Sequence, residues 1–429
     1  MPAALEVRSV VTGIIFALVL VGVIVRPRGL SEAVFALVGG ALMLGIGVVS
    51  PVQAAQKVAG NWNVFLFFLG LFTISAIADL AGVFDWLADR AARLSGGSSR
   101  RLLINVFLLG ALVSAFLSND ATVLILTPVV LTLITRLGLP ARPYVFACAF
   151  IANAASFTLP VSNPVNIVVL TAFPVPLPAY LVHLLPAAVA SVAINLVVFL
   201  LLFRRDLRGR FAFDLMGEVA AVKEFPAFFR SVAAWLTVTV VVYVLAAIRE
   251  FPLGLVAALS GSGLVVLALL FRRLSWSHLA QEISWSLFGL VAGLLVLIQG
   301  LENVGVTPLL ARLLLAGGNS KVVGAFSSVA TAAVGSNIMN NLPATFVLTA
   351  TIGHVPDAAL RGVLAYGTIV GADLGPNITI VGSLSTMLWL LILRRRDVEV
   401  SALEFMKLGA PVTLLLLACS AGLLALTAR

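Results

Sequence analysis

The chain has 429 residues, of which 61% are hydrophobic and only 10% are charged, whereas about a quarter of the residues of a soluble domain are charged. Its net charge of +9 does not indicate nucleic-acid binding, because the basic residues lie in short clusters between apolar runs. The two cysteines, Cys148 and Cys419, lie inside apolar segments and imply no disulfide framework.

Apolar runs follow one another along the whole chain, and many are long enough to cross a bilayer, which takes about 17–25 residues. Because the runs are continuous and do not alternate with polar residues, we predict an all-α polytopic membrane protein and not a β-barrel. Residues 83–94 have an amphipathic pattern, which predicts a helix at the membrane interface. The spans of the first half are expected near residues 9–25, 30–49, 62–81, 144–173 and 180–203.

The most informative stretch is Ser118-Asn119-Asp120, which lies between the apolar segments 102–117 and 121–136 with no polar loop around it. An ionisable side chain at this depth is costly and is typical of an ion or substrate pathway. Each arm of about 16 residues reaches about 24 Å, which is short for a hydrocarbon core of about 30 Å. We therefore predict a re-entrant hairpin, whose non-helical tip lines a cavity.

A second interruption lies inside the span expected at residues 144–173. Residues 158–164 contain Pro160 and Pro164 together with Ser162 and Asn163, in an otherwise apolar environment. Proline removes a backbone donor and clashes with the preceding turn, so these residues predict a broken helix.

Six blocks of the first half recur in the second half at a nearly constant offset of about 220 residues, which indicates an internal repeat. Trp62-Asn63-Val64-Phe65 recurs as Trp285-Ser286-Leu287-Phe288, and Asn119-Asp120 recurs as Asn340-Asn341. Residues 1–203 are predicted to form the first repeat, residues 204–230 a cytoplasmic linker, and residues 231–429 the second repeat.

Five crossings in each half make the two repeats inverted, with about ten transmembrane helices, two re-entrant hairpins and two broken helices in all. In this topology most of the 27 Lys and Arg residues lie on the face that carries the linker. The positive-inside rule makes that face cytoplasmic. We therefore expect both termini on the outer face of the cytoplasmic (inner) membrane.

The polar residues at the tips and breaks are the candidate site. Carboxamides and hydroxyls offer donors and acceptors together, and suit a small neutral polyhydroxyl solute or a partly dehydrated cation. Asp120 and Asp373 are the two acids among them, and a carboxylate inside a membrane protein can carry a proton. The candidate substrate-binding residues are Ser118, Asn119, Asn153, Ser162, Asn163, Asn166, Asn340, Asn341, Asn377, Ser383 and Thr386.

A structural interpretation competes with this one, because buried Asn and Ser side chains often cap helices or satisfy free backbone groups. Asp120 favours function, since its position recurs as Asn341 in the second half. Glu302 ends a span and is expected at the interface, with a proton-transfer role left open. The sequence contains no metal-ligand spacing and no Gly-Lys-Ser/Thr nucleotide motif, so neither a metal nor another cofactor is expected.

Several motifs resemble the ArsB-type arsenite/antimonite effluxers of the ion transporter superfamily. The resemblance covers nearly the whole chain and implies expulsion of arsenite or antimonite in exchange for protons. Arsenic(III) prefers thiolates, but two cysteines in separate spans cannot supply three, so an Asn/Ser/Thr cage is expected. The motifs are Phe116-Leu117-Ser118-Asn119-Asp120-Ala121, Ile338-Met339-Asn340-Asn341-Leu342-Pro343, and residues 371–377 followed by 382–389.

The chain departs from that family at three positions. The family often has Asp where this chain has Asn153, Lys where it has Asn377, and Pro where it has Ile380. Loss of a buried acid together with a buried base keeps the local charge balanced. It also leaves Asp120 and Asp373 as the better candidates for carrying the proton.

Three other functions stay open from the sequence. The chain could be a sodium/proton antiporter of the same superfamily, or a carboxylate carrier, although no Lys or Arg lies in the tips. It could also be the membrane subunit of a pump driven by a cytosolic ATPase. Dependence on sodium or on ATP distinguishes the first and the last of these from a proton-driven effluxer.

Overall fold

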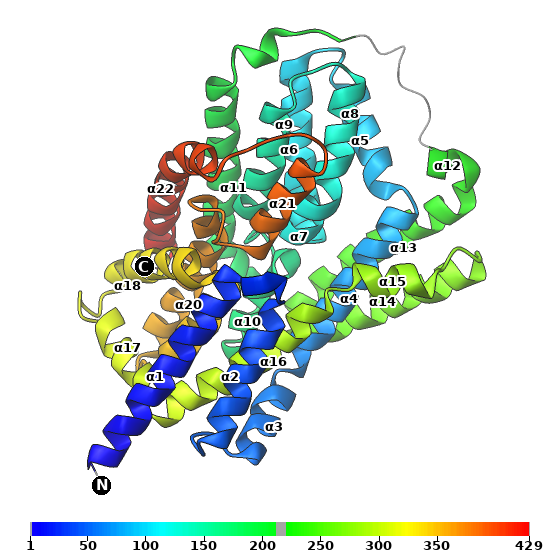
Figure 1. The fold of residues 1–429 in the computed structure, drawn as a ribbon. Helices are drawn as coiled ribbons and strands as arrows, with labels where there is room; N and C mark the ends of the chain where they lie inside the picture. The colour runs from blue at the N-terminus through cyan, green and yellow to red at the C-terminus, as the bar shows by residue number, and fades with distance from the viewer. Residues whose placement is uncertain (1, 212–219, 429) are drawn as a thin grey trace.

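The computed structural model describes residues 2–211 and 220–428, and the chain is helical in these two ranges (Figure 1). Residues 212–219 of the predicted linker lie outside the described residues. The elements of the first half are α1 (Pro2–Val25), η1 (Pro27–Gly29), α2 (Glu32–Gly45), α3 (Pro51–Gly60), α4 (Trp62–Leu80), α5 (Val83–Leu94), α6 (Ser99–Phe116), α7 (Asn119–Ala121), η2 (Thr122–Leu126), α8 (Thr127–Arg136), α9 (Arg142–Ala154), η3 (Pro160–Ser162), α10 (Pro164–Ala172), α11 (Leu177–Leu202) and η4 (Asp206–Arg208). Those of the second half are α12 (Ala220–Glu224), α13 (Pro226–Ile248), α14 (Leu253–Leu270), α15 (Trp276–Glu282), α16 (Trp285–Asn303), α17 (Val306–Leu314), α18 (Lys321–Met339), α19 (Asn341–Ile352), α20 (Ala358–Leu374), η5 (Gly375–Asn377), α21 (Leu384–Arg394) and α22 (Ala402–Thr427).

The predicted multi-pass helical architecture is confirmed. Within the described ranges, 10 helices are long and apolar enough to cross a membrane. The predicted hairpin arms α6, α7–α8 and α18 are among these ten, whereas α2 has 14 residues and is shorter than the span expected at 30–49. The predicted amphipathic segment 83–94 coincides with α5.

The early helices of the two halves interlock through close backbone contacts. Helix α4 packs along α14, and α16 packs along α2. Where α4 crosses α14, a Cβ added to Gly70 would lie 2.1 Å from the carbonyl carbon of Ala257. Where α16 crosses α2, a Cβ added to Gly293 would lie 2.3 Å from the carbonyl carbon of Ala36. Gly70 and Gly293 occupy equivalent positions of the sequence repeat. The two helix crossings are therefore equivalent contacts, one contributed by each repeat. The inverted orientation of the repeats stays a prediction.

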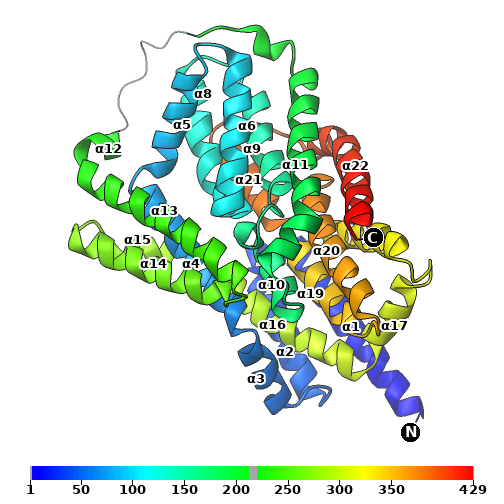
Figure 2. The ribbon, with the colours of Figure 1, turned by 180° about the vertical axis from the view of Figure 1, so that it is seen from behind.

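Two hydrophobic clusters divide the molecule. One is formed mainly by α5, α6, α8, α9, α11 and α20–α22. The other is formed mainly by α1–α4, α10, α14, α16 and α19. Figure 1 shows the first group at the top and side of the molecule and the second below it, and Figure 2 shows α13 and α14 side by side on the reverse.

Both hairpins have tips enclosed by other segments. Ser99 at the start of α6 and Leu139 after α8 both lie against Gly209, so the first hairpin enters and leaves at one end of the molecule. The second hairpin, α18 and α19, turns at Asn340, which has φ 72°. Both predicted breaks are present, at η3 between α9 and α10 and at η5 between α20 and α21.

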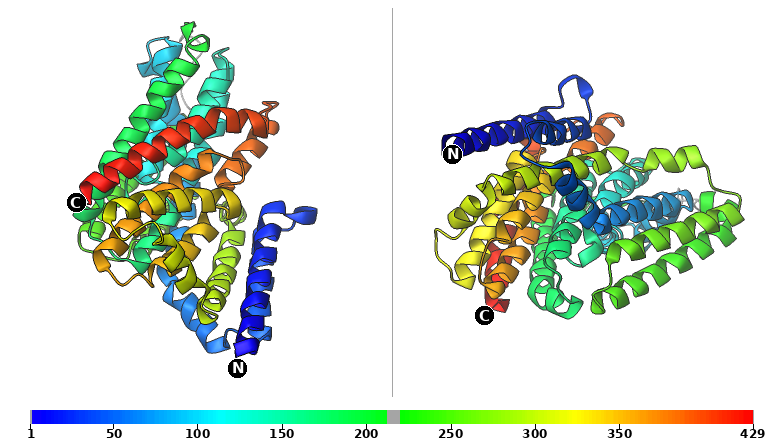
Figure 3. Two further views of the ribbon diagram at one scale, coloured as in Figure 1. Left: turned by 90° about the vertical axis from the view of Figure 1, so that its left-hand side faces the viewer. Right: turned by 90° about the horizontal axis from the view of Figure 1, so that it is seen from below.

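Helices α11 and α22 lie together near the C-terminus and part towards their other ends (Figure 3, left).

Candidate functional site

The tip of the first hairpin is a capped helix start. The Oγ of Ser118 accepts a hydrogen bond from the N–H of Ala121 at 3.0 Å, and the Oδ1 of Asn119 accepts one from the N–H of Asp120 at 2.9 Å. These bonds satisfy backbone donors that the broken helix leaves free. The carboxylate of Asp120 accepts a hydrogen bond from the Oγ of Ser385 at the start of α21.

The backbone directly after Asp120 is irregular. Residues 122–126 form a π-helical turn that leads into α8, where Pro128 follows Thr127. Proline cannot donate to the carbonyl one turn earlier, which explains why the ordinary α-helical pattern is interrupted here. Single π-helical turns are frequent at functional sites.

Asp120 and Ser118 line a cavity of about 90 Å³. Residues of α4 also line this cavity, and so do Glu282 and Ser284. The wall residues Phe72 and Ala121 belong to different hydrophobic clusters, so the cavity lies at the boundary between the two. A cavity of this size has room for one small solute or several water molecules.

The break in the second half links the two hairpin tips. The N–H of Asn341 donates to the carbonyl of Gly382 at 3.0 Å. Three residues further on, Ser385 donates to Asp120, and its own N–H is held by the Oγ of Ser383 at 3.1 Å. Movement of either tip therefore requires movement of the segment 382–385 or the loss of these bonds.

Asp373 is fully buried at the C-terminal end of α20. Its Oδ1 accepts a hydrogen bond of 2.7 Å from the Nδ2 of Asn163, the N-cap residue of α10. Its Oδ2 has no hydrogen-bond partner among the described residues. A buried carboxyl oxygen without a partner is costly unless it carries a proton or binds a solute or water.

Asn153 and Asn377 meet across the two halves. The Nδ2 of Asn153 donates to the Oδ1 of Asn377 at 2.9 Å, and both side chains are buried. The Nδ2 of Asn377 donates in turn to the carbonyl of Phe150 at 3.3 Å. Two of the three positions at which this chain departs from the ArsB-type pattern are thus direct neighbours.

This contact predicts a strong coupling between the two positions. Asn153→Asp alone or Asn377→Lys alone buries an unpaired charge and is expected to lower the free energy of unfolding by about 3–5 kcal/mol. The double variant pairs the two charges and is expected to regain most of that loss. Thermal unfolding of the four proteins in detergent measures the coupling, and additive losses in the double variant would show that the side chains do not interact.

The other candidate residues take part in local bonds. Ser162 donates to the carbonyl of Ala115 at 2.8 Å and so ties the first break to the first hairpin. Asn166 donates to the carbonyl of Ser156, and Asn340 accepts from the N–H of Leu342 at 3.4 Å. Thr386 is buried on α21. The structure therefore places these four around the tips and breaks, while only Ser118 and Asp120 of the predicted residues line the cavity.

Two residues at the site were not singled out by sequence reasoning. Ser385 is the partner of Asp120, and its place next to a break, inside the motif 382–389, is the signal that could have indicated it. Asn337 lies one turn before the second tip and holds the break, since its Nδ2 donates to the carbonyl of Gly375 at 2.8 Å and its Oδ1 accepts from Thr379 at 2.7 Å. A carboxamide in an apolar helix at this position is the signal that points to it.

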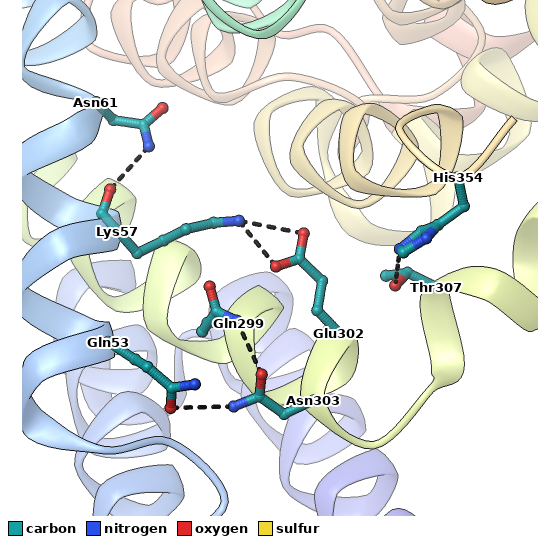
Figure 4. A network of polar contacts seen from close by, with 8 residues as sticks. All are labelled: Gln53, Lys57, Asn61, Gln299, Glu302, Asn303, Thr307 and His354. Carbon is teal, nitrogen blue, oxygen red and sulfur yellow. Dashed lines mark hydrogen bonds and ion pairs between the residues drawn. The ribbon is translucent and has the colours of Figure 1, made fainter. Parts of the chain in front are cut away.

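A second polar region lies at the opposite end of α16 and borders a cavity of about 600 Å³ (Figure 4). Lys57 of α3 forms an ion pair of 2.9 Å with Glu302, and both groups line this cavity. His354 and Thr307 are 3.0 Å apart on the other side. Thr349 also lines the cavity, and its buried hydroxyl has no hydrogen-bond partner in the described part of the chain.

Comparisons with known proteins agree with the helical carrier architecture. The family model described as "Citrate transporter" matches residues 16–371. The arsenical pump membrane protein of Yersinia enterocolitica is 33% identical over 428 residues, which cover 96% of this chain and 98% of that protein. That of Escherichia coli (strain K12) is 32% identical over 426 residues, with the same coverage.

This chain belongs to the arsenical pump membrane protein family. The resemblance inferred from the motifs is confirmed, and the chain is a multi-pass membrane transporter and not an enzyme. The YdaH transporter of Alcanivorax borkumensis has the same overall fold, with a TM-score of 0.56 at 16% identity over 92% of this chain and 96% of that one. A likeness at this level of identity concerns the fold alone.

Proposed function

We propose that this chain expels arsenite or antimonite across the cytoplasmic membrane in exchange for protons. Two relatives that cover 96% of this chain are named as arsenical pump membrane proteins. Arsenous acid is a small neutral solute with three hydroxyl groups, which carboxamides, hydroxyls and a carboxylate can bind through hydrogen bonds. The early helices of each half would form the scaffold, and the hairpins and broken helices the moving unit.

One observation carries this proposal: Asp120 is held by Ser385 at a hairpin tip and faces a small cavity between two hydrophobic clusters. An acid in this position can bind either a proton or a solute hydroxyl, but not both in the same geometry. Competition for one carboxylate is the simplest way to couple the exit of a solute to the entry of a proton. Asp373 is the second candidate, because one of its oxygens lacks a partner among the described residues.

The description of the matching family model makes a carboxylate carrier the second candidate function. A citrate-like substrate with several negative charges requires cationic partners in its site. The described residues that line the Asp120 cavity include two acids, Asp120 and Glu282, and neither Lys nor Arg. The charges around this cavity therefore favour a neutral or cationic substrate.

The proposed topology has inverted repeats divided by the linker 204–230, with both termini on the outer face. Two contacts support it. The hydroxyl of Ser9, near the N-terminus, donates to the carbonyl of Val304, the residue that follows α16. The hydroxyl of Thr427, near the C-terminus, donates to the carbonyl of His183, which lies at the end of α11 that is remote from the linker. Accessibility of single cysteines at both termini in whole cells tests this orientation.

The function is tested by arsenite accumulation in inside-out vesicles that contain the chain and are energised by respiration. In buffer without sodium and ATP, we expect accumulation that collapses when a protonophore is added. Vesicles without the chain provide the control, and citrate in place of arsenite tests the carboxylate carrier.

The same vesicles distinguish the remaining alternatives. Accumulation that appears only after sodium is added would indicate a sodium-coupled carrier. Accumulation that requires ATP and a cytosolic fraction would indicate the membrane subunit of an ATPase-driven pump. Either result would contradict proton exchange by the chain alone.

A further inference from the structure

A groove of about 790 Å³ separates α11 from α22 on the outside of the helical bundle. Its walls include Val198, Leu202, Leu403 and Leu415, and its polar end includes Arg142 and Lys407. The side chains of Leu202, Leu403 and Leu415 are 55%, 59% and 46% exposed, although they belong to helices that are long and apolar enough to cross a membrane. The groove is therefore open towards the lipid.

The shape of the groove follows from the way in which the two helices pack. At one end they are held together, because the hydroxyls of Ser191 and Ser420 are 3.0 Å apart and buried, and Thr427 contacts the carbonyl of His183. Towards the other end they part (Figure 3, left). Pro411 lies inside α22 and lines the groove. A proline in a helix removes one backbone hydrogen bond and bends the helix, which accounts for the separation.

The polar end of the groove has an excess of positive charge. Arg142 forms an ion pair of 3.1 Å with Glu404, and Lys407 forms none with any described residue. The chain segments that leave α11 and enter α22 at this end add Arg204, Arg205 and the run 394–396, against the acids Asp206, Asp397 and Glu399. A group that occupies the polar end is thus favoured if it is negatively charged.

We propose that this groove binds an anionic phospholipid, with its phosphate between Arg142 and Lys407 and an acyl chain between α11 and α22. Beyond Lys407, the apolar wall from Leu408 to Leu415 rises about 10 Å along α22, which suits the first half of an acyl chain. A zwitterionic lipid offers the same acyl chains without net charge, so the two cations select phosphatidylglycerol over phosphatidylcholine. Glu404 competes with the phosphate for Arg142 and limits the affinity.

The proposal is tested by native mass spectrometry of the purified full-length chain with equal amounts of phosphatidylglycerol and phosphatidylcholine. The wild-type chain is expected to retain phosphatidylglycerol selectively. Arg142→Gln with Lys407→Gln should abolish the selectivity, whereas Arg142→Lys with Lys407→Arg should keep it. Glu404→Gln removes the competing carboxylate and should increase retention several-fold, an effect that a purely structural ion pair would not produce.

Two further variants distinguish lipid binding in the groove from the general attraction of an anionic lipid to a basic membrane face. Leu415→Trp fills the groove and leaves every charge in place, so it should reduce retention of phosphatidylglycerol. Arg230→Gln with Arg272→Gln removes two exposed cations from the same basic face outside the groove and should leave it unchanged. Equal retention of the two lipids by the wild type, or unchanged retention in Leu415→Trp, would overturn the proposal. Gel filtration of each variant confirms that a loss of lipid is not a loss of fold.

Discussion

Replacement of Asp120 by asparagine is expected to reduce proton-driven arsenite accumulation to the level of vesicles that lack the chain. Asparagine has nearly the same shape as aspartate, and its oxygen can still accept the hydrogen bond that Ser385 donates. It cannot take up and release a proton, so the exchange cycle lacks its coupling step. The measurement is arsenite accumulation in energised inside-out vesicles, with and without a protonophore.

The matched control is Asp89→Asn, which removes a carboxylate that pairs with Arg93 on α5. This variant should transport nearly as the wild type does, because an exposed ion pair contributes about 0–1 kcal/mol. Asp373→Asn should be measured in parallel, since Asp373 is the second candidate acid at the site and is fully buried. If Asp120→Asn kept near-normal accumulation that the protonophore abolished, Asp120 would have no part in the coupling.

Valine in place of Gly70 or Gly293 is expected to prevent correct assembly of the two halves. At both positions an added Cβ would lie within 2.4 Å of backbone atoms of the crossing helix. A backbone cannot rotate away as a side chain can, so α4 and α14, or α2 and α16, would have to separate. Overpacking typically costs about 1–3 kcal/mol, and these contacts should exceed that range because the obstacle is rigid.

Fluorescence-detected gel filtration and thermal unfolding in detergent measure this effect. Gly422→Val is the matched control, because Gly422 lies inside α22 and no described heavy atom outside its own helical turn is within 4 Å of an added Cβ. Ala257→Gly should not rescue Gly70→Val, since the nearest atoms are the carbonyl carbon and oxygen of residue 257 and not its side chain. A normal elution profile for Gly70→Val would refute the close crossing of α4 and α14.

The sequence by itself determined the membrane class, the hairpin tips and the helix breaks. These features are local, because a polar or proline residue inside an apolar run has few ways to be accommodated. The tip at residues 118–120, the break near Pro160 and the amphipathic helix at residues 83–94 could therefore be predicted at nearly their observed bounds. The motifs around Asp120 and Asp373 were also sufficient to indicate the family.

Only the tertiary structure decided which polar groups are partners. Asn153 with Asn377, Asn163 with Asp373, and Asp120 with Ser385 are contacts between residues more than 200 positions apart. No local pattern encodes such contacts, because they depend on how the two halves pack against each other. The same reason explains why the lipid-facing groove between α11 and α22 could not be predicted: it arises where two helices that are distant in sequence part from each other.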